Sequence, residues 1–209
     1  MSHILIAGLG DLGTGLAEQL LADGHRVSAI RRGSRCPAGV ELYSQDLLEG
    51  AAMLPPDPVD LVVIIMTPSE YNEEGYLKAY VRAPQTLLDA LAGQQPLPPV
   101  IFVSSTAVFG DVAGEVDELT PPRPTRYNGK VLLAAEEELS IRSHCTVVRF
   151  SGIYGPAAIG RSTRRRGWPG ARTHCRPPSG PTAFTGMIVW ACSRAWLMAG
   201  WQGRKCRRW

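Results

Sequence analysis

Aspartate and glutamate are absent from the last 59 of the 209 residues. All 19 acidic residues lie in residues 1–150, with 11 of the 22 lysines and arginines, so this part has a formal charge of −8. The other 11 basic residues and all five tryptophans lie in residues 151–209. The overall charge of +3 therefore averages two segments of opposite character. With 44% hydrophobic residues the chain can still bury a sizeable core, which excludes a disordered or collagen-like protein.

Paired cysteines are also missing, and we expect no signal peptide. The five cysteines are odd in number and form no C-x-x-C pair, which argues against a disulfide framework and a zinc site, so we expect free thiols and no metal. The first residues lack the basic and apolar regions of a signal peptide, so we expect a cytoplasmic protein. The apolar run 184–201 contains Arg194, which argues against a membrane span.

Short apolar runs alternate with helical patterns in residues 1–150, which is typical of a parallel sheet covered on both faces. The runs that we expect as strands are Ile4–Ala7, Arg26–Ile30, Val40–Tyr43, Asp60–Met66, Pro99–Ser104 and Cys145–Phe150. Helical patterns follow at residues 12–21, 76–91 and 129–139, and Pro84 predicts that the second is kinked or divided in two. The predicted fold class is α/β, a three-layer Rossmann fold with a doubly wound parallel sheet.

A glycine-rich turn, Gly8-Leu-Gly-Asp-Leu-Gly13, follows the first predicted strand and opens the first helix. Gly8 permits a tight turn, Gly10 lets the backbone approach a pyrophosphate, and Gly13 lets helix and strand pack closely. The sequence therefore predicts a dinucleotide-binding turn, which also includes Asp11 and Leu12. A tight turn without a ligand is the alternative.

The end of the second predicted strand normally distinguishes the two nicotinamide dinucleotides. A carboxylate there accepts from the ribose 2′-hydroxyl, whereas arginine pairs with a 2′-phosphate. This chain has Arg31 and Arg32 with Ser34 and no acid, which favours NADP, with NAD still possible. A solvated basic turn is the alternative. Asp46, after the third strand, is a candidate partner for the adenine amino group or a helix cap.

The stretch Ser104-Ser-Thr-Ala-Val-Phe-Gly110 resembles the S-S-x-x-V-Y-G motif of the extended short-chain dehydrogenase/reductase family, which includes NAD(P)-dependent nucleotide-sugar epimerases and dehydratases. Farther on, Arg149-Phe-Ser-Gly-Ile-Tyr-Gly-Pro156 is similar to the R-x-x-x-x-Y-G-P segment of that family. With the glycine turn, the resemblance spans residues 3–156. It implies hydride transfer between a nicotinamide and a small-molecule substrate, of the sugar-nucleotide type or another carbonyl or hydroxyl compound. It also implies a possible homodimer.

The resemblance also implies roles for individual residues. The second serine of the motif, Ser105, would hydrogen-bond the substrate oxygen, while Ser104 and the pair Thr67 and Pro68 would lie near the cofactor. In the family, a Tyr-x-x-x-Lys pair on the next helix performs the acid–base work, and the lysine holds the nicotinamide ribose. Lys130 matches the lysine.

This sequence departs from the family at the tyrosine. Arg126 occupies the position four residues before Lys130, and Tyr127 lies only three residues before it. Neighbours at i,i+3 share a helix face, but the phenol is rotated by about 100° from the family position. Tyr127 is therefore either the acid–base residue or a surface tyrosine without a partner. The run 136–138 of three glutamates predicts a solvated helix face, and the four histidines, without spaced partners, predict structural or solvated roles.

The resemblance stops after residue 156. Residues 157–209 are rich in Arg, Trp, Gly, Pro and Cys, so we predict a basic tail, poorly structured or with a short helix, after a 1–156 NAD(P)-binding domain. The composition suggests a GC-rich frame translated out of phase, with the substrate lobe largely missing. A nucleic-acid or membrane tail is the alternative, but no recognised module supports it. Two further hypotheses stay open, an NADP-binding sensor or pseudoenzyme without turnover and an inactive truncated product.

Overall fold

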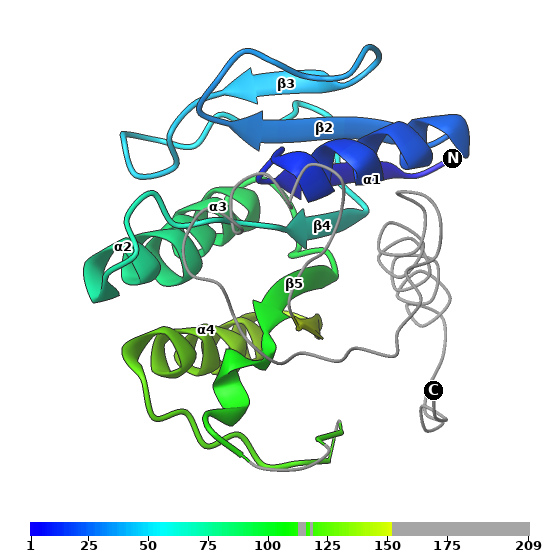
Figure 1. Ribbon diagram of the computed structural model, residues 1–209. Coiled ribbons are helices and arrows are strands. Elements are labelled where there is room, and N and C mark those ends of the chain that lie inside the picture. Colours follow the sequence, from blue (N-terminus) through cyan, green and yellow to red (C-terminus); the bar gives the residue numbers. More distant parts are fainter. Residues whose placement is uncertain (113–115, 118, 152–209) are drawn as a thin grey trace.

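Six parallel strands form one sheet in the order β3-β2-β1-β4-β5-β6 (Figure 1). The computed structural model describes residues 1–112, 116–117 and 119–151. The strands are β1 (His3–Ala7), β2 (Arg26–Arg31), β3 (Glu41–Ser44), β4 (Leu61–Ile64), β5 (Val100–Ser105) and β6 (Cys145–Phe150). The helices are α1 (Asp11–Ala22), α2 (Glu73–Leu77), α3 (Ala83–Ala92) and α4 (Tyr127–Arg142). The predicted α/β fold class and all six predicted strands are confirmed.

The long helical pattern is divided by a change of helix type. A π-helical turn, Lys78–Arg82, joins α2 to α3, and Pro84 is the second residue of α3. Proline has no N–H to donate to the preceding turn, so the hydrogen-bond ladder changes its spacing there. The prediction of a kinked or divided helix at Pro84 is confirmed.

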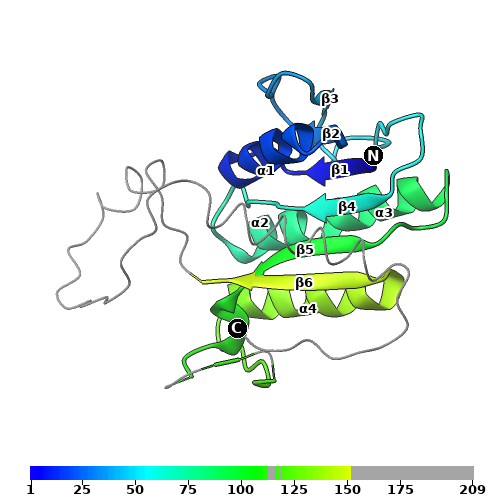
Figure 2. The ribbon, with the colours of Figure 1, turned by 90° about the vertical axis from the view of Figure 1, so that its right-hand side faces the viewer.

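Two apolar cores lie on opposite faces of the sheet (Figure 2). One face packs against α1, where Leu16 and Leu20 meet Ile6 and Val63. The other face packs against α3 and α4 and contains the fully buried Phe102. Alternate residues of each strand serve opposite cores because successive side chains of a strand point to opposite faces. The described part of the chain thus has the three layers that the sequence predicts.

The strand order reverses between β1 and β4, since β2 and β3 follow β1 to one side and β4 begins the other side. In open parallel sheets, ligands bind in the crevice at the carboxyl ends of the strands at such a reversal. No helix among the described residues is long and apolar enough to cross a membrane. The run 184–201, the Tyr154-Gly-Pro156 match and the predicted boundary at residue 156 lie outside the described residues.

Candidate dinucleotide site

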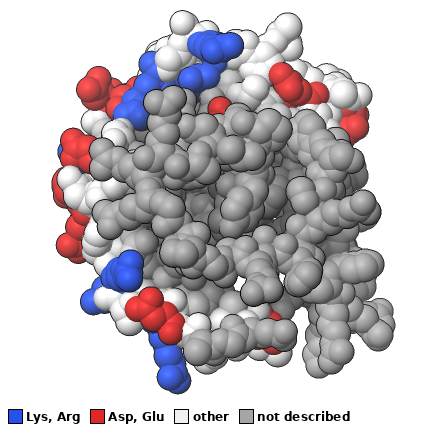
Figure 3. All heavy atoms as spheres, in the orientation of Figure 1, with Lys and Arg blue, Asp and Glu red and all other residues white. Residues whose placement is uncertain are grey.

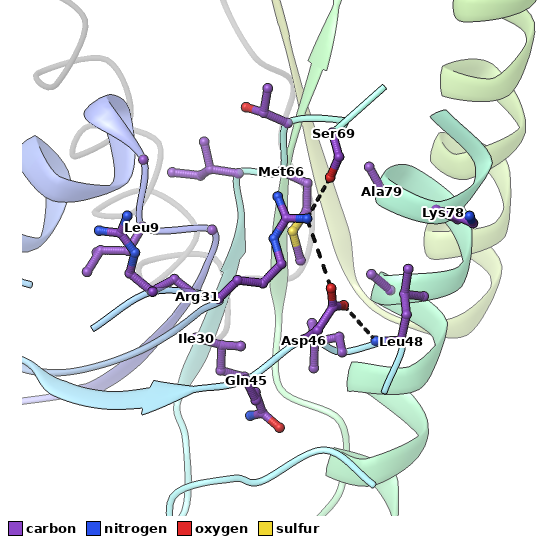
Figure 4. Close-up of a pocket in the computed structure, with 18 of the residues that line it drawn as sticks. Leu9, Ile30, Arg31, Gln45, Asp46, Leu48, Met66, Ser69, Lys78 and Ala79 are labelled. Carbon is purple, nitrogen blue, oxygen red and sulfur yellow. Dashed lines mark hydrogen bonds and ion pairs between the residues drawn. The ribbon is translucent and has the colours of Figure 1, made fainter. Parts of the chain in front are cut away.

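A pocket of about 740 Å³ opens at the carboxyl ends of the first four strands (Figure 4). Four segments, each following a strand, contribute to its lining, and the start of the π-helical turn closes its far side. Of the predicted cofactor residues, those that line the pocket are Gly8, Gly10, Arg31, Arg32, Asp46 and Thr67. The strand reversal and the pocket therefore coincide.

The glycine turn shows a different requirement at each of its three glycines. Gly8 has φ +105°, and a Cβ there would lie 2.0 Å from the carbonyl oxygen of Ile65. A Cβ on Gly13 would lie 2.3 Å from the carbonyl oxygen of Gly8. A Cβ on Gly10 would meet nothing within 4 Å, and Gly10 lines the pocket. The first and third glycines are thus needed for packing, whereas the second leaves open space where a ligand can approach the backbone.

The first turn of α1 lies directly behind this open space. Gly10 is the N-cap residue and no side chain caps the helix, so backbone N–H groups at its N-terminus are available to an anion. Asp11 is exposed in the first turn, while Leu12 packs against the core beneath α1 and Gly13 is buried. These three predicted cofactor residues do not line the pocket, and their contact with a cofactor stays a prediction.

The two arginines that end β2 extend in different directions. Arg31 Nη1 donates to the carbonyl oxygen of Arg35 at 2.5 Å. Arg32 Nη1 donates to Ser69 Oγ at 2.6 Å and lies 4.0 Å from Asp46 Oδ2, so this guanidinium connects the segments after β2, β3 and β4. Figure 4 shows these interactions as dashed lines that meet between Ser69 and Asp46. Both arginines line the pocket from the β2 side.

The segment after β3 forms a tight turn against the pocket. Asp46 Oδ1 accepts a hydrogen bond from Leu48 N at 3.0 Å, so its carboxylate caps this turn and also faces the pocket. Gln45 holds the same segment through both ends of its amide, which pair with the backbone of Met53 at 2.6 and 2.7 Å. The predicted helix cap is wrong, because the described chain has a turn and no helix between β3 and β4, and the adenine contact stays a prediction.

Sequence reasoning did not identify Ser69, Glu70 and Lys78, which line the pocket from the β4 side. Thr67, which it did identify, is exposed at the pocket, and Pro68 is buried outside the lining. A signal for Ser69 existed, because polar residues that follow a buried strand end lie at the ligand-binding edge. No sequence signal pointed to Lys78, because its position at the pocket depends on how the π-helical turn packs.

Ser104 and Glu136 belong to a buried ion-pair network. Ser104 Oγ donates to Glu136 Oε1 at 2.5 Å, and Arg149 Nη2 donates to Glu136 Oε2 at 2.6 Å. The guanidinium of Arg149 also lies over the ring of Phe109, 5.0 Å from its centroid. The prediction of a solvated face at Glu136 is wrong, because this side chain is only 4% exposed and points between β5 and β6. A cofactor role for Ser104 stays a prediction, and its hydroxyl is turned toward α4.

Ser105, Tyr127 and Lys130 lie outside the large pocket. Ser105 Oγ accepts from Ala107 N at 3.2 Å and caps the 3₁₀ turn Thr106–Phe109 that follows β5. Tyr127 is the first residue of α4, and its hydroxyl donates to the carbonyl oxygen of Tyr71 at 2.7 Å. Lys130 is exposed and has no ion pair within the described part of the chain. These three residues share one end of the sheet, but no described interaction joins them.

An aromatic cluster surrounds the start of α4. The ring of Tyr76 lies 5.5 Å from that of Tyr127 and 5.4 Å from that of Tyr80, and Tyr80 packs on Phe102. Burial raises the pKa of Tyr80 to about 12 and also raises the pKa of Tyr76. Both phenols therefore stay neutral at pH 7.

Basic side chains gather near the turn that follows β2, with acidic ones beside them (Figure 3). No group of three or more His, Cys, Asp or Glu that could hold a metal occurs among the described residues. Cys36 and Cys145 are free thiols, and His3, bonded to Ser28 and Pro58, has a structural role as expected.

The sequence matches a protein-family model and a curated protein. The model of the NAD dependent epimerase/dehydratase family matches residues 4–176. Protein YeeZ of Escherichia coli K12 is 32% identical over 171 residues, which cover 75% of this chain and 60% of that protein.

Solved structures with a similar fold include two that are described as binding NAD or as NAD-dependent. A protein of Methylobacillus flagellatus, provisionally assigned as an NAD-dependent epimerase/dehydratase, superimposes with a TM-score of 0.61 at 36% identity, over 80% of this chain and 62% of that one. MoeE5 in complex with UDP-glucose and NAD gives a TM-score of 0.61 at 26% identity, over 74% and 56%. The chain thus spans about 60% of the length of the relatives it matches.

Proposed function

The chain belongs to the NAD dependent epimerase/dehydratase family, and on this premise we propose that it binds a nicotinamide dinucleotide in the pocket after β1–β4. The observation that carries this proposal is the glycine turn. Gly8 and Gly13 are fixed by packing, while Gly10 leaves open space at the N-terminus of α1 inside a pocket of about 740 Å³. The residues present therefore fit a pyrophosphate held by backbone N–H groups.

We further propose that NADP is preferred over NAD. The guanidiniums of Arg31, the last residue of β2, and of Arg32, the residue after it, line the pocket, whereas the carboxylate of Asp46 follows a different strand. Arginine pairs with a phosphate dianion through several charge-assisted hydrogen bonds, whereas a ribose hydroxyl gives it only one weak partner. The name of the family and the descriptions of the two solved structures refer to NAD, so the preference rests on Arg31 and Arg32 alone.

Fluorescence titration with NADPH and NADH tests both proposals. Wild-type protein binds NADPH more tightly, and Arg31→Ala weakens NADPH binding about tenfold, equivalent to about 1.4 kcal/mol, with NADH binding little changed. Arg35→Ala is the matched control, because Arg35 is exposed, close in sequence and outside the pocket lining. Failure of both dinucleotides to bind would contradict the cofactor proposal, and equal losses for both would contradict the NADP preference.

As an enzyme, the protein would act on a small carbonyl or hydroxyl compound, for which a sugar nucleotide is the first candidate. The bound dinucleotide supplies hydride transfer. Ser105 would orient the substrate oxygen, Tyr127 would exchange the proton and Lys130 would hold the ribose. Turnover with a panel of sugar nucleotides tests this role, and Ser105→Ala lowers kcat by about 100-fold if the hydroxyl contacts the reacting oxygen.

The second candidate is a dinucleotide-binding protein without turnover. The Tyr127 hydroxyl donates to the backbone of Tyr71, which supports this candidate, as does the three-residue spacing from Lys130. A phenol engaged in this way must break a hydrogen bond before it can exchange a proton with a substrate. NADPH binding without turnover on any substrate of the panel supports this candidate, and turnover that depends on Tyr127 contradicts it.

A further inference from the structure

One wall of the pocket is the loop of residues 67–72, which joins β4 to α2. Thr67, Ser69 and Glu70 of this loop line the pocket. All three are exposed, and Pro68 beside them is the buried residue of the loop. From Ser69 to Asn72, hydrogen bonds and the junction with α2 therefore contribute most to the shape of the loop.

The end of the loop that meets α2 is fixed locally. Asn72 caps α2, and its Oδ1 accepts from Gly75 N at 2.7 Å. Gly75 packs so closely that a Cβ on it would lie 2.1 Å from the carbonyl oxygen of Glu70. Asn72 Nδ2 also donates to Glu70 Oε2 at 3.0 Å, so the support from the α2 end reaches Glu70.

Two side chains from other elements also bond to the loop. Arg32 donates to Ser69 Oγ at 2.6 Å from the β2 side, and Tyr127 donates to the Tyr71 carbonyl oxygen at 2.7 Å from the α4 side. The Tyr127 ring is itself positioned by an edge-on contact with Tyr76 of α2. The hydroxyl thus reaches the loop from a ring that packs against α2.

We propose that Tyr127 is a positioning residue for the dinucleotide pocket, holding the loop 67–72 in the conformation that receives the ligand. This inference rests on the proposed dinucleotide binding. It gives the phenol a function separate from proton transfer, because the hydroxyl acts through the backbone carbonyl of Tyr71, the residue next to Glu70 of the pocket lining. A loop that is ordered before binding does not have to be ordered by the ligand, so affinity increases.

Tyr127→Phe separates this function from a catalytic one. Phenylalanine keeps the ring contact with Tyr76 and removes only the hydroxyl that donates to Tyr71. We expect NADPH and NADH to bind about fivefold more weakly, equivalent to about 1 kcal/mol for one hydrogen bond, by the same factor for both because the loop is common to both sites. A residue that acts only in proton transfer would leave both dissociation constants unchanged.

Tyr43→Phe is the matched control. The Tyr43 hydroxyl donates to Glu41 Oε1 at 2.5 Å, and Tyr43 does not line the pocket. Removal of the Tyr43 hydroxyl should lower the stability of the protein without changing its affinity for either dinucleotide. Hydrogen exchange supplies a second measurement, because the backbone amides of residues 69–72 should exchange faster in Tyr127→Phe and at the wild-type rate in Tyr43→Phe.

The outcomes distinguish the two proposals. If the wild-type protein binds neither dinucleotide, the proposed function fails. If the wild-type protein binds and Tyr127→Phe shows the same dissociation constants, the positioning role is overturned. Unchanged exchange of residues 69–72 in Tyr127→Phe overturns it independently of any ligand.

Discussion

The two halves of the sheet use their polar groups differently. After β1, β2 and β3, the backbone of the glycine turn and the side chains of Arg31, Arg32 and Asp46 face the pocket. In the half made by β5, α4 and β6, Ser104 and Glu136 are instead bonded within a buried network. One half therefore presents its polar groups to a ligand, and the other uses them to hold its own elements together.

This difference explains why the glycine turn is stronger evidence for a binding site than the serine and arginine motifs of β5 and β6 are for a catalytic one. The S-S-x-x-V-F-G stretch and the arginine of the R-x-x-x-x-Y-G-P match are brought together by Glu136, with Arg149 over the ring of Phe109. Part of the resemblance thus marks a structural network. Dinucleotide binding needs small residues and a helix N-terminus, which the fold itself provides, whereas catalysis needs a polar side chain that is free to meet a substrate.

The largest effect should come from breaking the buried network. Glu136→Ala leaves the Arg149 guanidinium, only 24% exposed, without its carboxylate, which costs about 3–5 kcal/mol of unfolding free energy. Glu137→Ala on the same helix is the control, because Glu137 is exposed and should change stability by no more than about 0.5 kcal/mol. Urea denaturation measures both. Equal stabilities of the two variants would contradict the structural role given to this half.

In the half made by β1, β2 and β3, substitutions in the glycine turn should distinguish residues needed for packing from residues needed for binding. Gly13→Ala places a Cβ against the Gly8 carbonyl oxygen and should cost about 2–3 kcal/mol of stability. Gly10→Ala meets open space and should cost no more than about 1 kcal/mol, yet it should weaken NADPH binding about tenfold because the methyl group occupies the approach to the backbone. Thermal unfolding and NADPH titration measure the two effects. If Gly10→Ala binds NADPH as tightly as the wild type, the proposal that the pyrophosphate lies at this turn is contradicted.

Much of this fold could be predicted from the sequence, because each strand is a short apolar run and each glycine of the turn has a local reason. The same holds for Pro84, whose missing N–H disturbs a helix wherever it occurs. Gly8, Gly10 and Arg31 were identified as site residues because they directly follow predicted strands, where the chain emerges at the ligand-binding edge.

The remaining features depend on contacts between residues far apart in the sequence. From the sequence, Glu136 is one of three consecutive glutamates on a solvated helix face. In the structure, β6 places Arg149 beside it. Tyr127 was judged by its spacing to Lys130, whereas its partner is the backbone of Tyr71, 56 residues away. No periodicity or local motif encodes such pairings, so only the packed structure could show them.

The smallest expected effect is a pH dependence of stability in the half made by β5, α4 and β6. Burial raises the pKa of the Cys145 thiol from 9.0 to about 11. Between pH 9 and 11 the unfolded chain has lost the proton that the folded chain retains, so stability falls as pH rises through this window, by about 1–2 kcal/mol for a thiol that is still partly exposed. Cys145→Ala should flatten this loss, and Cys36→Ala, which removes an exposed thiol, should not. Urea denaturation at pH 8, 9.5 and 11 compares the variants, and an equal slope for Cys145→Ala and wild type would show that this thiol ionises as readily in the folded state as in the unfolded one.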